Sequence, residues 1–124
     1  MNEEVVVGVY RQQFNELLNL NISSMSIVRS KGLISHLIKR RHFVALKYID
    51  YIPDIIRNPD FIGVNPNETK GMSIELVKCF KDNILMGIKM SPTKDKLYVS
   101  TMFDISTAKI RRRVHSKRLI VLDK

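Results

Sequence analysis

The stretch MSIELVKCFKDNILMGIKMSPTKDKLYVSTMF, residues 72–103, decides the fold of this chain. It contains three runs that are rich in β-branched, aromatic and other apolar residues, at Met72–Phe80, Asn83–Met90 and Lys96–Phe103. Only short polar segments separate the runs, and connections of this kind join neighbouring antiparallel strands. The stretch therefore predicts an antiparallel meander.

The segments around the meander mix helical and strand signals. Apolar residues at helical spacing within residues 31–48 predict a helix in one or two pieces. Its buried stripe would consist of Leu33, Ile34, Leu37 and Ile38. Further helices are expected within residues 4–20, 54–58 and 105–114, and further strands at 24–29, 61–64 and 119–122. Because the helices come mainly before a contiguous antiparallel sheet, the order of elements predicts the α+β class.

Length and composition limit the class of protein. The 124 residues favour one domain over residues 1–124, and the apolar fraction of 44% is ordinary for a folded protein. No apolar run approaches the ~18 residues that a membrane span needs, and the first four residues, MNEE, are acidic where a signal peptide is basic. We therefore expect a cytoplasmic protein, or one that another machine delivers, without a membrane partner. Cys79 is the sole cysteine and the three histidines lack zinc-site spacing, so neither a disulfide nor a metal or cofactor is expected.

The charge is strongly positive and unevenly distributed. Lysine and arginine number 21 against 12 aspartate and glutamate, which gives a formal charge of +9. Six cations and no acid lie between Arg29 and Lys47, and six more cations without an acid lie between Lys109 and Arg118. This segregation favours a cationic face and a polyanionic partner, most simply nucleic acid. A solvated basic surface that binds nothing specific is the alternative.

The segment HLIKRRH, residues 36–42, combines cations with two histidines. In a straight helix His36 and Arg40 lie on one face, whereas His42 lies about 240° around the axis from His36. Both histidines can reach one site only if the helix breaks near Arg41. Because histidine titrates near neutral pH, one of them is a candidate general base. In the alternative interpretation both are surface histidines.

The last two runs of the meander carry polar groups among apolar ones. Alternation places Tyr98, Ser100 and Met102 on one face, and Leu97, Val99, Thr101 and Phe103 on the other, which we interpret as the core face. Lys89 interrupts the apolar run at residues 84–90. A lysine at such a position either stabilises phosphate charge or extends to solvent.

Three consecutive arginines, Arg111, Arg112 and Arg113, lie in the last predicted helix. On a helix they fan over roughly 200°, so at most two of them can face one ligand. Guanidinium groups bind phosphate in a bidentate manner, which favours phosphate contact by at least one of the three. A solvated helix end is the alternative, since cations also complement the helix dipole there.

Several other classes of site are disfavoured. No pair of carboxylates lies within the basic segments, as a two-metal hydrolase would need, and the five glycines form no phosphate-binding loop. The aromatic residues are too few for a platform that stacks single strands. The remaining histidines, hydroxyls and guanidiniums suit cleavage of an RNA phosphodiester without a metal.

From Ser30 onward the sequence resembles the phage-associated branch of the barnase–EndoU–colicin–RelE nuclease superfamily. The matching stretches are His36–His42, Tyr51–Asp60, Ser73–Lys78 and Leu97–Met102, with Lys109–Leu119 as the closing element. The resemblance covers residues 30–119 and leaves 1–29 as an N-terminal extension. It departs at Phe43, where a proline is expected in relatives. It implies an α+β fold in which N-terminal helices pack on a four- or five-stranded antiparallel sheet.

The resemblance also implies metal-independent ribonuclease activity, often in toxins or phage-borne effectors. The expected partners are RNA, with tRNA and mRNA as candidate classes, and an inhibitor or immunity protein. We expect catalytic roles for His36, His42, Lys89, Ser100, Thr101 and Arg112, and RNA contacts from Arg40, Arg41, Tyr98, Arg111, Arg113 and Lys117. If neither histidine is the base, Lys89, Glu75 and Tyr98 are the other candidates. A non-catalytic nucleic-acid-binding module and an inactive phage-associated interaction domain remain open as alternatives.

Overall fold

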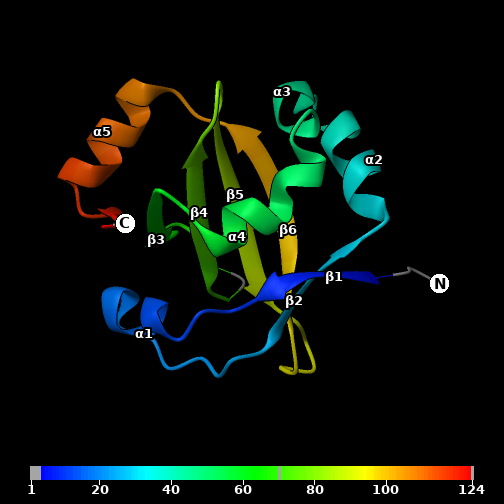
Figure 1. Ribbon diagram of the computed structural model, residues 1–124, viewed down its shortest axis with the longest axis horizontal. Helices are drawn as coiled ribbons and strands as arrows, with labels where there is room; N and C mark the ends of the chain where they lie inside the picture. Colours follow the sequence, from blue (N-terminus) through cyan, green and yellow to red (C-terminus); the bar gives the residue numbers. More distant parts are fainter. Residues whose placement is uncertain (1–3, 70, 124) are drawn as a thin grey trace.

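The structure is a computed structural model that describes residues 4–69 and 71–123. Its strands are β1 (Glu4–Val9), β2 (Ser26–Ser30), β3 (Phe61–Val64), β4 (Ser73–Cys79), β5 (Asn83–Met90), β6 (Leu97–Asp104) and β7 (Leu119–Val121). Its helices are α1 (Gln13–Leu18), α2 (Gly32–Lys39), α3 (Phe43–Leu46), α4 (Ile52–Arg57) and α5 (Thr107–His115), with a 3-10 turn, η1, at Ile49–Tyr51. Within the described residues the strands form one sheet in the order β1-β2-β6-β5-β4-β3-β7 (Figure 1).

The meander predicted from residues 72–103 forms the centre of this sheet. β4 pairs with β5 and β5 pairs with β6, and both pairs are antiparallel. The connection between β5 and β6 is a tight turn in which the backbone N–H of Ser91 donates to the carbonyl oxygen of Lys96 at 2.9 Å. The prediction of three consecutive antiparallel strands is therefore confirmed.

The sheet is larger than the expected four or five antiparallel strands, and that expectation is wrong. β1 and β2, which lie almost entirely in the expected N-terminal extension at residues 1–29, pair with each other and continue the sheet beyond β6. β2 runs parallel to β6, which is possible because a long crossover through helices and three strands separates the two. The run EVVVGV of β1 is rich in β-branched residues, which favour a strand wherever a partner strand is present. The described part of the chain is thus an α+β fold with a mixed, seven-stranded sheet.

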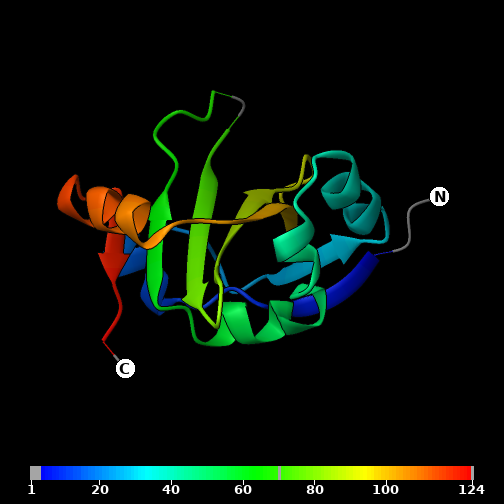
Figure 2. The ribbon, with the colours of Figure 1, turned by 90° about the horizontal axis from the view of Figure 1, so that it is seen from above.

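The two faces of the central strands are covered differently. On one face Ile74, Leu76 and Met86 belong to the main hydrophobic core, together with buried residues of α1 and α4. On the other face Ile110 of α5 packs into a smaller core that includes Val77. Figure 2 shows α4 on one side of the sheet, and α5 and the α2–α3 pair at opposite ends of the other side. Between these helices the second face is open, because a cleft lined by residues of β4, β5 and β6 lies there.

The helices α2 and α3 pack beside the C-terminal half of β6. β2 pairs with β6 only as far as Tyr98, so among the described strands none continues the sheet there. α2 buries Leu33 and Leu37, as predicted, but Ile34 and Ile38 are exposed. The expected four-residue stripe is wrong for these two residues, because a helix that lies along a single strand buries only a narrow row of side chains.

A β-bulge interrupts the alternation of β6. The register between β5 and β6 shifts so that Gly87 lies opposite Thr101, whereas Ile88 lies opposite Val99. Ser100 is therefore the extra residue on β6. A bulge of this kind re-aims the side chains on either side of it.

The bulge overturns part of the expected core face of β6. Leu97 and Val99 are buried in the main core, as predicted, but after the bulge it is Met102 that is buried there. Thr101 and Phe103, expected on the core face with Leu97 and Val99, line the open side instead. The reason is that one inserted residue moves every later side chain to the opposite face of a strand.

Candidate active site

A cleft of about 620 Å³ occupies the open part of the second face. β4, β5 and β6 form its floor, the α2–α3 segment lines one end, and α5 with the residues after it lines the other. Its lining residues are His36, Arg40, His42, Asn65, Asn67, Glu68, Ser73, Glu75, Leu85, Gly87, Lys89, Ser100, Thr101, Phe103, Arg113 and Arg118. The cleft thus brings together the histidine segment, the polar positions of the meander and part of the arginine segment.

The helix break that the two histidines require is present. Arg41 separates α2 from α3 and has a φ of 59°, in the left-handed region. The backbone N–H of His42 donates to the carbonyl oxygen of Leu37 at 2.8 Å, and that of Arg41 donates to the carbonyl oxygen of Ile38 at 3.0 Å. This pair of bonds is the Schellman motif that ends many helices. The turn brings both His36 and His42 to the cleft.

Both imidazoles are half-buried at the same end of the cleft. The ring of His42 packs against the ring of Phe103, with 5.8 Å between centroids and an angle of 40° between the planes. His36 also lines a smaller hollow that it shares with Tyr98 and Ser100. Among the described residues neither imidazole has a hydrogen-bond or ion-pair partner, so both are available to a ligand.

The bulge places two consecutive hydroxyls, those of Ser100 and Thr101, in the cleft. The Ser100 hydroxyl donates to the carbonyl oxygen of Gly87 at 3.1 Å. A Cβ at Gly87 would lie 3.2 Å from the Ser100 Oγ and 3.4 Å from the Ser73 Oγ. The absence of a side chain at Gly87 therefore leaves room on the floor of the cleft between these hydroxyls.

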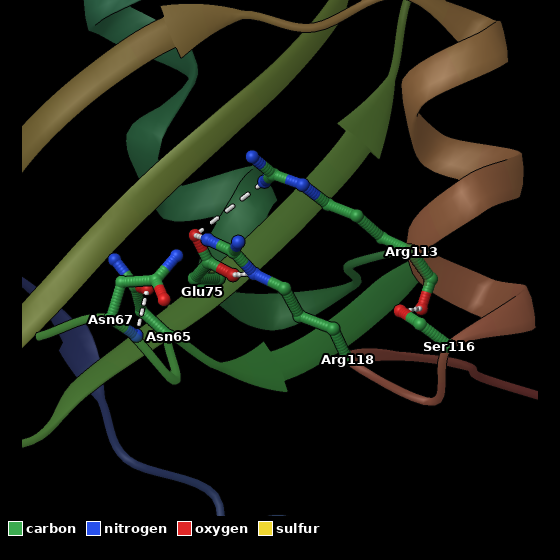
Figure 3. Close-up of polar contacts among 6 residues, drawn as sticks. All are labelled: Asn65, Asn67, Glu75, Arg113, Ser116 and Arg118. Carbon is green, nitrogen blue, oxygen red and sulfur yellow. Dashed lines mark hydrogen bonds and ion pairs between the residues drawn. The ribbon is translucent and has the colours of Figure 1, made fainter.

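Glu75 anchors the arginine end of the cleft. It lies on β4 and is only 3% exposed. Arg118 binds it in a bidentate manner, with Nε donating to Oε1 and Nη2 donating to Oε2, both at 2.9 Å. Arg113 reaches from α5 toward the same carboxylate and places Nη1 3.7 Å from Oε2 (Figure 3). Two guanidiniums therefore share one buried carboxylate.

The charge at this end of the cleft is not balanced. Nη1 of Arg113 is buried and makes no hydrogen bond to the described residues. Burial first, and the nearby Arg118 second, lower the pKa of the Arg113 guanidinium from its ordinary value, and Glu75 offsets part of this effect. An anion bound in the cleft would supply both the missing hydrogen-bond acceptor and the missing negative charge.

Lys89 lies on the floor of the cleft and faces the loop between β3 and β4. Its Nζ is 2.9 Å from Oε2 of Glu68 in that loop. Asn65 orders the loop, because its Oδ1 accepts a hydrogen bond from the backbone N–H of Asn67 at 2.9 Å. The backbone N–H of Asn65 also donates to the carbonyl oxygen of Ser73 at 2.9 Å. The ammonium of Lys89 is thus held at the cleft by a carboxylate that a phosphate can replace.

A comparison with protein families finds a match to the family described as phage-Barnase-EndoU-ColicinE5/D-RelE like nuclease3, over residues 4–112. The chain belongs to this nuclease family. The resemblance to the phage-associated branch of the superfamily is therefore confirmed, and nucleic acid is the substrate class that the family indicates. Comparisons with curated proteins and with solved structures find no match.

The family match ends within α5, before two residues of the cleft. It includes β1, β2 and the turn that carries the histidines, and it stops at residue 112. Arg113 and Arg118 follow it, so both arginine partners of Glu75 come from the segment of this nuclease after the matched region.

The remaining predicted residues of this nuclease lie around the cleft. Arg112 and Lys117 line a second hollow beside it, and Arg111 lines a third hollow on the outer side of α5. Tyr98 lines the small hollow next to the histidine helix, and Arg41 is exposed at the turn. Arg111 thus lies apart from Arg112 and Arg113, which both line the second hollow.

Sequence reasoning missed part of the cleft. Glu75 was named only as a substitute base, and its pairing with Arg118 was not predicted. The polar and charged lining residues with no predicted role are Asn65, Asn67, Glu68, Ser73 and Arg118. One available signal was the acidic residue within the apolar run SIELV, since a carboxylate buried in a strand needs a cationic partner.

Among residues 4–69 and 71–123, no three histidine, cysteine, aspartate or glutamate side chains are grouped closely enough to hold a metal ion. No helix in this part of the chain has the length and apolar content needed to cross a bilayer.

Proposed function

We propose that this nuclease is a metal-independent RNA endonuclease that cleaves by attack of a ribose 2′-OH on the adjacent phosphorus. The observation that carries the proposal is the composition of the cleft. Among the described residues, it combines two histidines without a hydrogen-bond or ion-pair partner and a buried guanidinium nitrogen, Nη1 of Arg113, that makes no hydrogen bond. The reaction needs a base, an acid and positive charge at the phosphorane, and these groups supply all three.

In this mechanism one histidine is the base and the other is the acid. A neutral imidazole removes the 2′-OH proton, and the 2′-oxygen forms a bond to phosphorus. The bond between phosphorus and the 5′-oxygen breaks, and an imidazolium gives its proton to that oxygen. The products are a 2′,3′-cyclic phosphate and a 5′-hydroxyl. His36 and His42 lie at the same end of the cleft, and single variants distinguish their roles.

The other cleft residues stabilise and orient the phosphate. Arg113 takes the charge-stabilising role expected of Arg112, because Arg113 is the one that lines the cleft. Lys89 assists once phosphate replaces Glu68 as its partner. The hydroxyls of the bulge donate to the non-bridging oxygens, and Arg40 contacts a flanking phosphate.

The donor set supports a reaction that uses no metal. Protonatable imidazoles and fixed cations supply the proton transfer and charge stabilisation that a metal-bound water would otherwise provide. Arg118 engages both oxygens of Glu75, so this carboxylate serves to hold the guanidiniums. In a phage-associated family such an activity suits an effector that degrades RNA in a bacterial cytoplasm.

The test compares single variants of the three histidines. His36→Ala and His42→Ala change the cleft, whereas His115→Ala is the matched control, because His115 lines the hollow on the outer side of α5. Each protein is incubated with total bacterial RNA and with short RNA oligonucleotides in excess chelator. We expect the wild type to yield 2′,3′-cyclic phosphate ends and a 2′-deoxy sugar at the cut site to block cleavage. At least one cleft variant should be slower by roughly a hundredfold, while the control cuts normally.

Each part of the proposal has an outcome that contradicts it. Cleavage that stops in chelator and returns with a divalent ion would overturn the metal-free mechanism. Wild-type protein that binds RNA but cuts none would favour the non-catalytic binding module. Normal cleavage by both cleft variants would move the base to Lys89, Glu75 or Tyr98. Growth of a bacterial host that is unaffected by expression of the active protein would remove the effector role.

A further inference from the structure

A second hollow adjoins the cleft at its arginine end. It has a volume of about 750 Å³ and lies between the end of α1, the end of β3 and the α5–β7 connection. Arg113 and Arg118 line both this hollow and the cleft. The two hollows therefore adjoin, with the guanidinium pair between them.

The lining of the second hollow differs from that of the cleft. Leu17, Val64, Pro66 and Ile120 supply apolar surface, and Leu17 is 42% exposed although it is a large apolar residue. The hollow is also positively charged, and among the described residues that line it none is acidic. Its cations are Arg112, Arg113, Lys117 and Arg118. An apolar surface beside cations fits one nucleotide, whose base packs on the apolar side chains and whose phosphate meets the cations.

Two of these cations are unengaged. Among the described residues, the exposed side chains of Arg112 and Lys117 have no hydrogen-bond or ion-pair partner. This contrasts with Arg118, which Glu75 holds in a bidentate pair. The carbonyl oxygens at the end of α5 repel an anion, so a phosphate here must be held by the long side chains that extend from that end.

We propose that the second hollow is a nucleotide subsite, and that the substrate is single-stranded RNA that continues from the cleft across the guanidinium pair. This inference rests on the proposed function, because it places the scissile phosphate in the cleft. The base of the neighbouring nucleotide occupies the hollow, and its phosphate lies between Arg112 and Lys117. A base can enter such a hollow only when it is unstacked and unpaired, which excludes a duplex of RNA from this site.

The experiment measures binding rather than cleavage. Wild type and variants are titrated by fluorescence anisotropy with fully 2′-O-methylated RNA of two, four, six and eight nucleotides, single-stranded, and with an eight-base-pair duplex. The test variants are Arg112→Gln and Lys117→Gln. Glutamine removes the positive charge but has backbone conformational preferences similar to those of arginine and lysine. Lys109→Gln is the matched control, since it removes one positive charge from an exposed position of the same helix that lines neither the cleft nor the second hollow.

We expect affinity to rise from two nucleotides to six, because the longer strands reach the second hollow. Each test variant should bind the six-nucleotide RNA roughly tenfold less tightly than the wild type, and should bind the dinucleotide with the same affinity as the wild type. For the six-nucleotide RNA, the slope of log affinity against log salt should be less steep by about 0.7 in each test variant than in the wild type. The control should keep the length dependence of the wild type.

Two results would overturn the subsite. One is a length dependence that is the same in Arg112→Gln, Lys117→Gln and the wild type. The other is a duplex that binds as tightly as the single strand and with the same sensitivity to these variants. Because cleavage is not the readout, the two proposals fail separately. RNA that is bound in this way but never cut refutes only the catalytic function, whereas RNA that is cut without any effect of the variants on binding refutes only the subsite.

Discussion

The two faces of β4–β6 are built from alternate residues of the same strands, yet they serve different purposes. On the closed face Ile74 and Leu76 are buried in the main core, whereas on the open face Ser73 and Glu75 line the cleft. Glu75 is nearly as buried as its apolar neighbours, although it carries a charge. The polar face is therefore a site whose charges are organised by contacts between distant segments, and is not merely a solvated side of a sheet.

The largest expected effect comes from adjacent substitutions on β4. Glu75→Ala leaves two guanidiniums without their carboxylate, so we expect the free energy of unfolding to fall by about 3–5 kcal/mol. Cleavage per folded molecule should also fall by roughly a hundredfold, because Arg113 loses its position. Ile74→Ala should cost a similar ~2–5 kcal/mol through the cavity that it creates, but should leave cleavage per folded molecule unchanged. Urea denaturation and cleavage rates at low temperature measure both quantities. Equal activities of the two variants would remove the distinction between the faces.

The next largest effect is expected from alanine substitutions of two glycines, Gly63 and Gly87. A Cβ at Gly63 would lie 1.9 Å from the carbonyl oxygen of Arg118, so Gly63→Ala must displace the backbone that leads into β7. We expect a loss of about 3 kcal/mol in the free energy of unfolding. Gly87→Ala meets the Ser100 hydroxyl at 3.2 Å, and the Ser73 hydroxyl and the Thr101 methyl group at 3.4 Å. It should cost less than ~1 kcal/mol while lowering kcat/KM, because its methyl group enters the cleft floor. Thermal unfolding and kinetics of both variants provide the measurement, and a harmless Gly63→Ala would contradict the close approach.

A smaller effect should come from the turn between the histidines. Arg41 adopts a left-handed conformation that glycine adopts more readily, so Arg41→Gly should raise the free energy of unfolding by about 0.5 kcal/mol. Arg41→Val should lower it by about 1 kcal/mol or more, since a β-branched residue is strained there. If Arg41 also contacts RNA, the glycine variant becomes more stable but binds RNA less tightly. Denaturation and anisotropy titrations separate these two effects, and a destabilised glycine variant would argue against the turn.

The smallest effect concerns a carboxylate outside the cleft. Asp95 is fully exposed in the β5–β6 turn, where hydrogen bonds from Thr93 first and Ser91 second lower its pKa. A carboxylate whose pKa is lower in the folded state stabilises the fold above its unfolded pKa, and this contribution disappears as the pH falls through the folded value. Thr93→Val should therefore raise the pKa of Asp95 and weaken the dependence of stability on pH in the acidic range. An NMR titration of Asp95 tests this, and an unchanged pKa would show that the hydroxyl does not matter.

Much of the central architecture could be predicted because the signals are local. The meander follows from β-rich runs with short polar connections, and Ser106, directly before α5, caps that helix by accepting from the backbone N–H of Lys109 at 3.1 Å. The need for a helix break near Arg41 followed from the angular spacing of the histidines. These features depend on residues that are neighbours in the sequence, where backbone preferences and side-chain spacing act directly.

The less predictable features depend on which segments meet. Which strands lie at the edges of the sheet depends on the strand with which β2 pairs. Because β2 pairs with only part of β6, in parallel, α2 and α3 pack beside the rest of that strand. The bulge at Ser100 depends on the register against Gly87, and it places Thr101 in the cleft instead of the core. Neither outcome has a signal in the residues of one strand alone.

The sequence by itself determined the family, the positive charge, the meander and the chemical groups that the site uses, because each of these is a property of contiguous residues or of composition. Only the tertiary structure decided that Glu75 meets Arg118 across 43 residues, that Arg113 rather than Arg112 lines the cleft, and that two hydroxyls lie on the same side of β6. The physical reason is that ion pairs and strand registers are chosen when distant segments pack together. Their energies depend on burial and geometry that no local stretch contains.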